Sequence, residues 1–167
     1  MVEALEIGSN LVTCVKNSVP ALVFGNRIGQ SDCSVSAMND RLGHALRFGV
    51  EYDAISPNPF LHRSCSLTIN SLTLVATANT PVRVTVKSAE APTLLIPFFE
   101  RHLSIIDRTR LEWAAHESAV LMPACARLGE ATTRSCLMVD LETRRLAATA
   151  SAMLGCDLDA APNFALD

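Results

Sequence analysis

The sequence predicts a mostly β domain, a β-barrel or β-sandwich with flanking helices, one of them amphipathic and C-terminal. Three observations lead to this fold class. From Arg63 onward, apolar and polar residues alternate in short segments, which is the period of a β-strand. At least seven such segments follow one another at intervals of about ten residues, as in all-β barrels and sandwiches. After Leu141 the apolar period becomes helical.

The composition is that of a folded globular protein. The chain has 167 residues, of which 49% are apolar and 19% charged, and this length suits one domain. It contains no apolar run long enough for a membrane helix and no basic, apolar leader, so we expect it in the cytoplasm. The formal net charge of −3 argues against nucleic-acid binding through this chain alone.

Residues 1–62 are predicted to form an N-terminal segment with one short strand and one short helix. Pro20–Phe24 is an apolar run that ends at Gly25, which is typical of a short buried strand. Ala37–Arg47 carries apolar residues at helical spacing, and Ser36 precedes it as a candidate N-cap.

Residues 63–141 are predicted to form the β-barrel core. Ser64–Ile69 and Leu72–Ala76 alternate as two neighbouring strands. In Val82–Lys87, valines alternate strictly with charged or polar residues, so we expect one apolar face and one solvated face. This segment is the clearest strand of the chain.

The later core segments are predicted to be a bulged strand, a hairpin and two short strands. Thr93–Phe99 is apolar on both faces, and Pro97 predicts a bulge because it has no N–H to donate. His102–Ile106 is expected to turn at Asp107–Thr109, and Arg110–Trp113 to return with Trp113 facing inward. The two short strands are Ala119–Pro123 and Cys136–Leu141.

Residues 142–155 are predicted to form the C-terminal helix. Leu146, Ala150 and Met153 follow a helical repeat, and Gly155 ends it as a C-terminal capping glycine. This apolar stripe must pack on the barrel, on another helix or on a second chain. Residues 156–167 are acidic and without periodicity, and we expect them to be a linker.

No motif for catalysis, metal binding or phosphate binding is present in the sequence. The four histidines lack His-x-His spacing, and there is neither a nucleophile elbow nor a glycine-rich phosphate loop. We therefore expect no enzymatic activity, no metal and no cofactor. The cysteines lack metal-ligand spacing and are expected to be reduced and structural: Cys14, Cys33, Cys65, Cys125, Cys136 and Cys156.

An apolar barrel interior is a possible site for a small molecule. Phe98, His102 and Trp113 are candidates for the wall of such a pocket. The competing interpretation is that the aromatic residues only fill the core and that the histidine is satisfied or exposed.

The order of the segments from Arg63 to Gly155 resembles the N-terminal, effector-sensing and dimerising domain of AraC-type transcription regulators. This resemblance covers a little over half of the chain, and where the family often has a glycine after the aspartate of the hairpin, Arg108 stands here. It is carried by the segments Pro92–Phe98, Ile106–Arg108, Leu111–Trp113, Ala119–Ala124, Met138–Leu141, Arg145–Ala147 and Met153–Gly155.

The resemblance implies a cupin-like β-barrel that binds a small organic effector, forms a homodimer and regulates transcription in bacteria. It implies DNA binding only through a helix-turn-helix domain that is not present in this chain, so that residues 156–167 lead toward a missing domain. Two alternatives remain open: a solitary small-molecule-binding module and a cupin-type metalloenzyme.

Overall fold

In this computed structural model the described residues are 19–46, 48–89, 91–99, 101–106, 108–115 and 119–157. Within the strands, the side chains of Phe48, His102, Ser104 and Ile106 are outside the description. Most of the predicted linker, residues 158–167, also lies outside the described residues.

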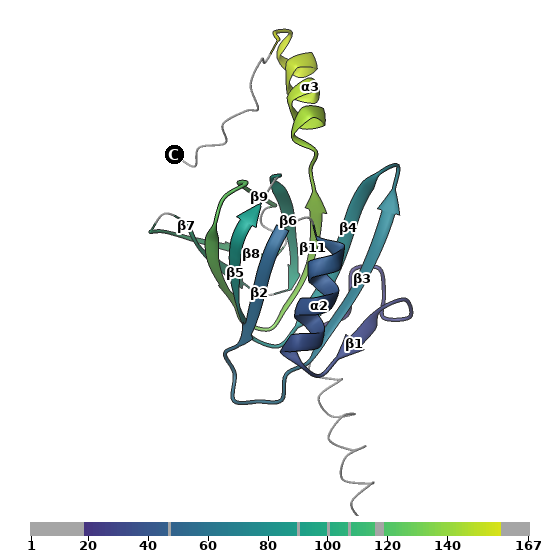
Figure 1. Ribbon diagram of the computed structural model, residues 1–167, viewed down its shortest axis with the longest axis vertical. Helices are drawn as coiled ribbons and strands as arrows, with labels where there is room; N and C mark the ends of the chain where they lie inside the picture. The colour runs from purple at the N-terminus through teal and green to yellow at the C-terminus, as the bar shows by residue number, and fades with distance from the viewer. Residues whose placement is uncertain are drawn as a thin grey trace, which may run out of the picture.

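The described chain folds into two antiparallel β-sheets and two helices, which confirms the mostly β prediction (Figure 1). The larger sheet has the strand order β1-β3-β4-β11-β6-β9, and the smaller sheet has the order β2-β5-β10-β7-β8. The strands are β1 (Gln30–Asp32), β2 (Phe48–Ala54), β3 (His62–Ile69), β4 (Leu72–Asn79), β5 (Val82–Ala89), β6 (Thr93–Phe99), β7 (Arg101–Ile106), β8 (Thr109–Ala114), β9 (Val120–Met122), β10 (Arg127–Ala131) and β11 (Arg134–Asp140).

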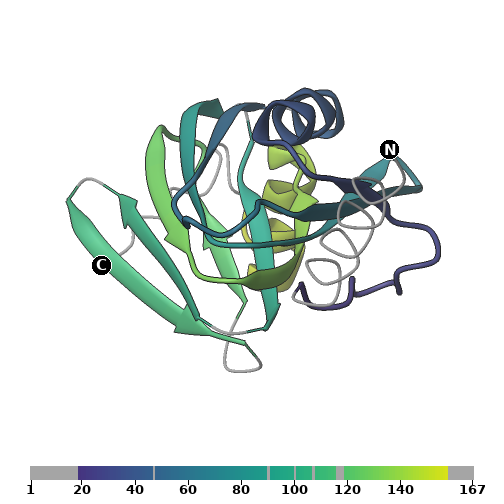
Figure 2. The ribbon, with the colours of Figure 1, turned by 90° about the horizontal axis from the view of Figure 1, so that it is seen from below.

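The two sheets face each other across the main core. Val75, Cys136 and Met138 of the larger sheet pack in one cluster with Tyr52 and Val82 of the smaller sheet. These residues alternate with outward-facing ones along their strands, so the period of two in the sequence selects the inner face. Figure 2 shows the strands surrounding this interior, with the β7–β8 hairpin extending outward on one side.

Helix α2 (Val35–Ala45) covers the gap between the edges of the two sheets (Figure 1). Its Met38 and Leu42 are fully buried in the main core. Asn39 bonds twice to the backbone of Tyr52 on the edge strand β2, since its Oδ1 accepts from Tyr52 N (2.8 Å) and its Nδ2 donates to Tyr52 O (3.2 Å). On the other side, Arg41 donates to Asp32 of the edge strand β1 at 2.7 Å. The helix therefore satisfies polar groups at both edges.

The outer face of the larger sheet is covered by the segment that begins at Val19. Val19 and Leu22 are buried there against Leu61, Cys65 and Ala76.

The strand predicted for Pro20–Phe24 is wrong, because the chain turns instead of extending. Leu22 O accepts from Gly25 N at 2.9 Å, and Leu22 N donates to the Asn26 side chain at 3.0 Å. Gly25 has a φ of +81°, which glycine adopts without steric cost. These apolar residues are buried by a turn that lies on the sheet.

Helix α2 begins two residues earlier than predicted. Ser34, and not Ser36, is the N-cap, and its Oγ accepts from Ala37 N at 3.1 Å. Three strands, β1, β2 and β10, were not predicted. Strand prediction relies on alternating apolar and polar residues. β1 has no apolar residue, and β10 contains an arginine and a glycine, so neither shows a clear alternation.

The predicted bulge in β6 is confirmed. Ser135 of β11 pairs with Phe99 and Cys136 with Pro97, so Phe98 is the extra residue on β6. The predicted hairpin is also confirmed, with Ile106 opposite Thr109 in β7 and β8. Arg108 in its turn has a φ of +71°, a conformation that favours glycine.

Helix α3 (Thr143–Leu154) follows β11 and stands away from the barrel (Figure 1). None of its residues is fully buried, and Gly155 ends it with a φ of +66°, as predicted. Among the described helices, neither is long and apolar enough to cross a bilayer.

Candidate functional site

A cavity of about 50 Å³ lies between the two sheets. Its wall combines side chains of both sheets, from β2 at one edge to β8 and β9 at the other. Pockets for drug-sized ligands are larger, about 300 Å³ or more, so this cavity fits only a small group. Its apolar wall is formed by Val84, Val86, Leu95, Leu103, Met122 and Met138.

Besides Glu130, five polar or amphipathic side chains line the cavity. They come from five different strands, and they give the apolar cavity a small number of groups that could orient a ligand. They are Tyr52, Thr93, Trp113, Arg127 and Arg134.

Arg134, the first residue of β11, is the unusual member of this set. Its side chain is only 5% exposed, yet its partners are neutral. Nε donates to Asn79 Oδ1 at 3.0 Å, and the guanidinium carbon lies 5.8 Å from the centre of the Tyr52 ring. Nη2 is buried and has no hydrogen-bond partner among the described residues. Within that part of the chain, Arg134 also takes part in no ion pair.

Asn79 and Arg134 lie opposite each other on β4 and β11, and His62 of β3 lies opposite Asn79. This register places the three side chains in one row across the larger sheet. His62 is fully buried, and burial lowers its pKa to about 4, so its ring is neutral at pH 7. Its Nδ1 lies 3.4 Å from Asp32 Oδ2, a long hydrogen bond.

Tyr52 supplies an uncharged phenol. Burial raises its pKa above the ordinary value of 10.0, and the neighbouring Arg134 only partly opposes this effect. The tyrosine therefore cannot act as a counter-ion for Arg134 at pH 7. Its backbone is held by two hydrogen bonds with the Asn39 side chain, one accepted and one donated by the amide.

Arg127 is a second cation in the wall of the cavity. Burial lowers its pKa from the ordinary value of 12.5, and its Nη1 donates to Pro123 O at 2.9 Å. Among the described residues that line the cavity, Glu130 is the single carboxylate carrier. That carboxylate is engaged elsewhere, because Arg83 Nε donates to it at 2.9 Å.

The structure brings one of the three predicted pocket residues into the cavity. Trp113 is 7% exposed, lines the cavity and packs with Met122. Phe98 is 36% exposed at the bulge and is not among the lining residues. His102 lies on β7 opposite Trp113, but its side chain is outside the description.

Sequence analysis missed Tyr52, Arg127 and Arg134. A signal for Arg134 was present, because Arg134, Cys136 and Met138 alternate along one strand and the last two are apolar. Carrying that alternation back by two residues places the arginine on the inner face. No comparable signal marks Arg127, whose strand does not alternate.

In the described ranges, no cluster of three or more His, Cys, Asp or Glu side chains could hold a metal ion. The described cysteines carry free thiols: Cys33, Cys65, Cys125, Cys136 and Cys156.

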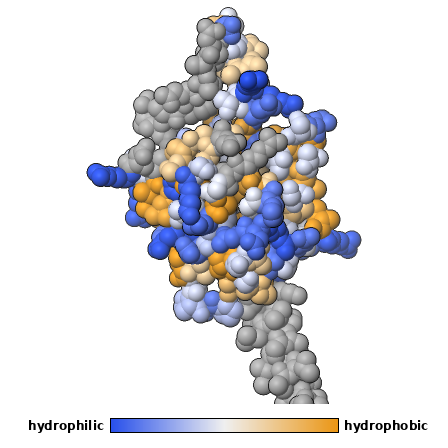
Figure 3. Space-filling view, viewed as in Figure 1, coloured by the Kyte–Doolittle hydropathy of each residue, from blue (hydrophilic) through white to orange (hydrophobic). Residues whose placement is uncertain are grey.

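A second hollow lies between helix α3 and the end of the barrel. It is open, and its walls include residues 71–73, 140–146 and 149. Arg145 of α3 crosses it, donating to Ser71 Oγ at 3.0 Å and pairing with Glu142 at 3.0 Å. Leu146 and Ala150 are half-buried, whereas Met153 is 83% exposed. Figure 3 shows hydrophobic surface on this helix at the top of the molecule.

No family model matches this chain, and no curated protein matches it in sequence. Among solved structures, the AraC-like transcriptional activator CuxR is similar with a TM-score of 0.57 and 12% identity. The likeness covers 77% of this chain and 52% of that chain, so this chain spans about half of the activator's length.

Two chains of the cupin fold are also similar to this one. A cupin superfamily protein from Desulfitobacterium hafniense has a TM-score of 0.41 and 13% identity over 53% of this chain and 83% of that one. A cupin-like protein from Thermotoga maritima has a TM-score of 0.41 and 10% identity over 55% and 84%. At 12% identity, what this chain shares with CuxR is a fold. The likeness to CuxR confirms that the resemblance to AraC-type regulators extends to the fold.

Proposed function

We propose that this chain is the ligand-sensing and dimerisation domain of a bacterial, cytoplasmic AraC-type transcription regulator. In the whole regulator, a helix-turn-helix domain outside these 167 residues binds DNA. The role of this chain is binding and not catalysis. The fold shared with CuxR supports the proposal, as does the acidic charge of −3, which suits a sensor better than a DNA-binding surface.

The cavity between the sheets is the observation that carries the proposal. It is small and mostly apolar, and several polar side chains converge on it. A core that served only for stability would exclude groups such as the Arg134 guanidinium, because burying a charge without a counter-charge is unfavourable. A ligand in the cavity supplies an interaction partner for the Arg134 guanidinium.

Strand β11 connects the cavity to helix α3. Arg134 and Met138 of this strand line the cavity, and the chain enters α3 three residues after Asp140. A ligand that binds one arrangement of β11 better than another shifts the population of α3 positions. Binding of the effector thereby changes the position or the mobility of whatever α3 contacts.

Helix α3 is the proposed dimerisation element. It has 12 residues and none is fully buried, although a helix of this length is only marginally stable without packing. Leu146, Ala150 and Met153 form the stripe that a second copy would cover. A symmetric dimer suits repeated or palindromic half-sites on DNA.

A ligand screen on the full 167-residue chain tests the proposal. Trp113 is the chain's single tryptophan and lies in the cavity, so its fluorescence reports directly on occupancy. We expect at least one class of small metabolite to give a saturable change in emission together with a rise in melting temperature. A Trp113→Phe variant is the control for the optical signal: the emission change should disappear, which assigns it to Trp113. A broad panel of charged and neutral metabolites without any saturable response would contradict the proposal.

A further inference from the structure

Among the described residues, the guanidinium of Arg134 has no negatively charged partner. An arginine side chain keeps its charge in proteins, and the interior screens that charge poorly. Arg134 is 5% exposed, and its Nη2 has no hydrogen-bond partner among the described residues. The side chain of Arg134 is also among those that line the cavity.

The neighbouring side chains that the structure describes do not provide a counter-charge for Arg134. Asn79 is a neutral amide, and Tyr52 and His62 are neutral at pH 7 for the reasons given above. The carboxylate of Asp32 is held by Arg41 at 2.7 Å. Glu130 is bonded to Arg83.

A second cation lines the same cavity. Arg127 donates to the backbone carbonyl oxygens of Pro123 and Cys125, and the carboxylate of Asp140 acts on it electrostatically. Two guanidinium groups thus border a cavity whose remaining wall is mainly apolar. The guanidinium groups attract an anion, and the apolar side chains favour a ligand that also has an apolar part.

From this arrangement we infer that the ligand of the cavity is a small monocarboxylate. Its carboxylate pairs with the guanidinium of Arg134, and its apolar body lies against Trp113 and Met122. The inference rests on the proposed function, because it names the ligand class of that same cavity. A volume of about 50 Å³ favours a carboxylate with a short hydrocarbon chain over a sugar or a nucleotide.

Paired probes of equal shape test the inference. Sodium butyrate and butyramide differ in charge but hardly in size, so comparing them isolates the carboxylate. We expect butyrate to change Trp113 emission and to bind at least tenfold more tightly than butyramide. Sodium chloride at the same concentrations controls for ionic strength and for a simple anion effect.

Two variants assign the effect to a residue. Arg134→Met keeps much of the side-chain volume and removes the charge, and we expect it to bind butyrate at least tenfold more weakly. Arg110→Met is the matched control, because Arg110 is on the smaller sheet with a side chain 69% exposed, and it should bind as the original chain does. Melting temperatures measured without ligand separate lost binding from lost folding.

The outcomes distinguish this inference from the proposed function. If butyramide or another neutral compound binds as tightly as butyrate, or if Arg134→Met retains the affinity, the carboxylate assignment is overturned while ligand sensing stands. An equal response to chloride also overturns it. If no compound of either kind produces a response, the proposed function itself fails.

Discussion

Asn39 of helix α2 forms two hydrogen bonds with the backbone of Tyr52 on β2, with distances of 2.8 and 3.2 Å. At this edge of the smaller sheet, the side-chain amide thereby forms the backbone hydrogen bonds that a further strand would otherwise form. Because the Tyr52 side chain lines the cavity, the same contact places one wall of the candidate site.

Removing the Asn39 amide should destabilise the fold. Asn39→Ala leaves one donor and one acceptor of β2 without partners, and we expect the free energy of unfolding to fall by about 2 kcal/mol. Asp40→Ala is the control, since it makes a similar change in helix propensity at an exposed position. Urea denaturation measures both, and equal values for the two variants would show that the contact contributes little.

The N-cap of α2 can be tested at two serines. Ser34→Ala removes the oxygen that accepts from Ala37 N, and we expect a loss of about 1 kcal/mol in the free energy of unfolding. Ser36→Ala changes an exposed residue inside the helix and should be neutral or slightly stabilising. The reverse order of stabilities, measured in urea, would place the helix start at Ser36.

His62 should make stability depend on pH. Its pKa is about 4 in the folded chain, mainly through burial, and near 6.5 in the unfolded chain. Between these values the unfolded chain binds more protons, so the free energy of unfolding falls as pH decreases from about 6.5 to 4. The groups that act on it are Asp32, Arg134 and Arg41.

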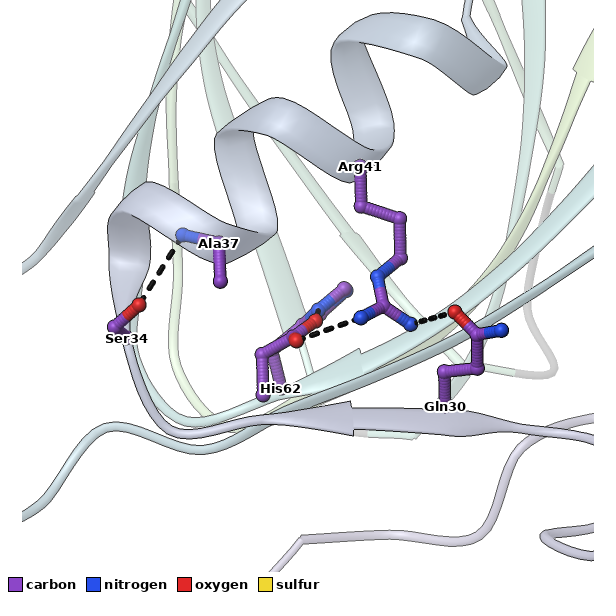
Figure 4. Close-up of polar contacts among 6 residues, drawn as sticks. Gln30, Ser34, Ala37, Arg41 and His62 are labelled. Atoms are coloured by element: carbon purple, nitrogen blue, oxygen red, sulfur yellow. Dashed lines mark hydrogen bonds and ion pairs between the residues drawn. The ribbon is translucent and has the colours of Figure 1, made fainter.

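The variant His62→Gln removes the titrating ring. Between pH 4 and 6.5, the free energy of unfolding of this variant should change by roughly 3 kcal/mol less than that of the original chain. His44→Gln, at an exposed position of α2, should keep the original dependence. Urea titrations at several pH values provide the comparison, and an unchanged slope in His62→Gln would assign the effect to other groups. Figure 4 shows His62 with Arg41 and Gln30 nearby.

The proposed dimer contact can be tested on α3. Met153 is 83% exposed, and Met153→Lys places a charge in the apolar stripe, so we expect the dimer to dissociate at least tenfold more readily. Ala148→Lys adds the same charge at an exposed position on the opposite side of the helix and should leave the dimer intact. Sedimentation over a concentration series measures both. A chain that is monomeric throughout would contradict the dimerisation proposal.

Local patterns predicted the elements whose side chains alternate cleanly. Val82–Lys87 lies inside β5, and the apolar repeat of Leu146 and Ala150 lies on α3. The bulge at Pro97 could be predicted because a missing N–H is a property of one residue. By contrast, Pro20–Phe24 is as apolar as a strand, and only the Leu22–Gly25 turn shows that it is not one.

The sequence by itself determined the mostly β class, the bulge, the hairpin and the C-terminal helix, because each depends on neighbours within a few residues. Only the tertiary structure decided that α2 joins the edges of two sheets and that Arg134 faces a cavity. Arg134 and its partner Asn79 are 55 residues apart, and their contact exists because β4 pairs with β11. Periodicity carries no information about which strands pair, so the polar row inside the barrel becomes visible only once the sheets have formed.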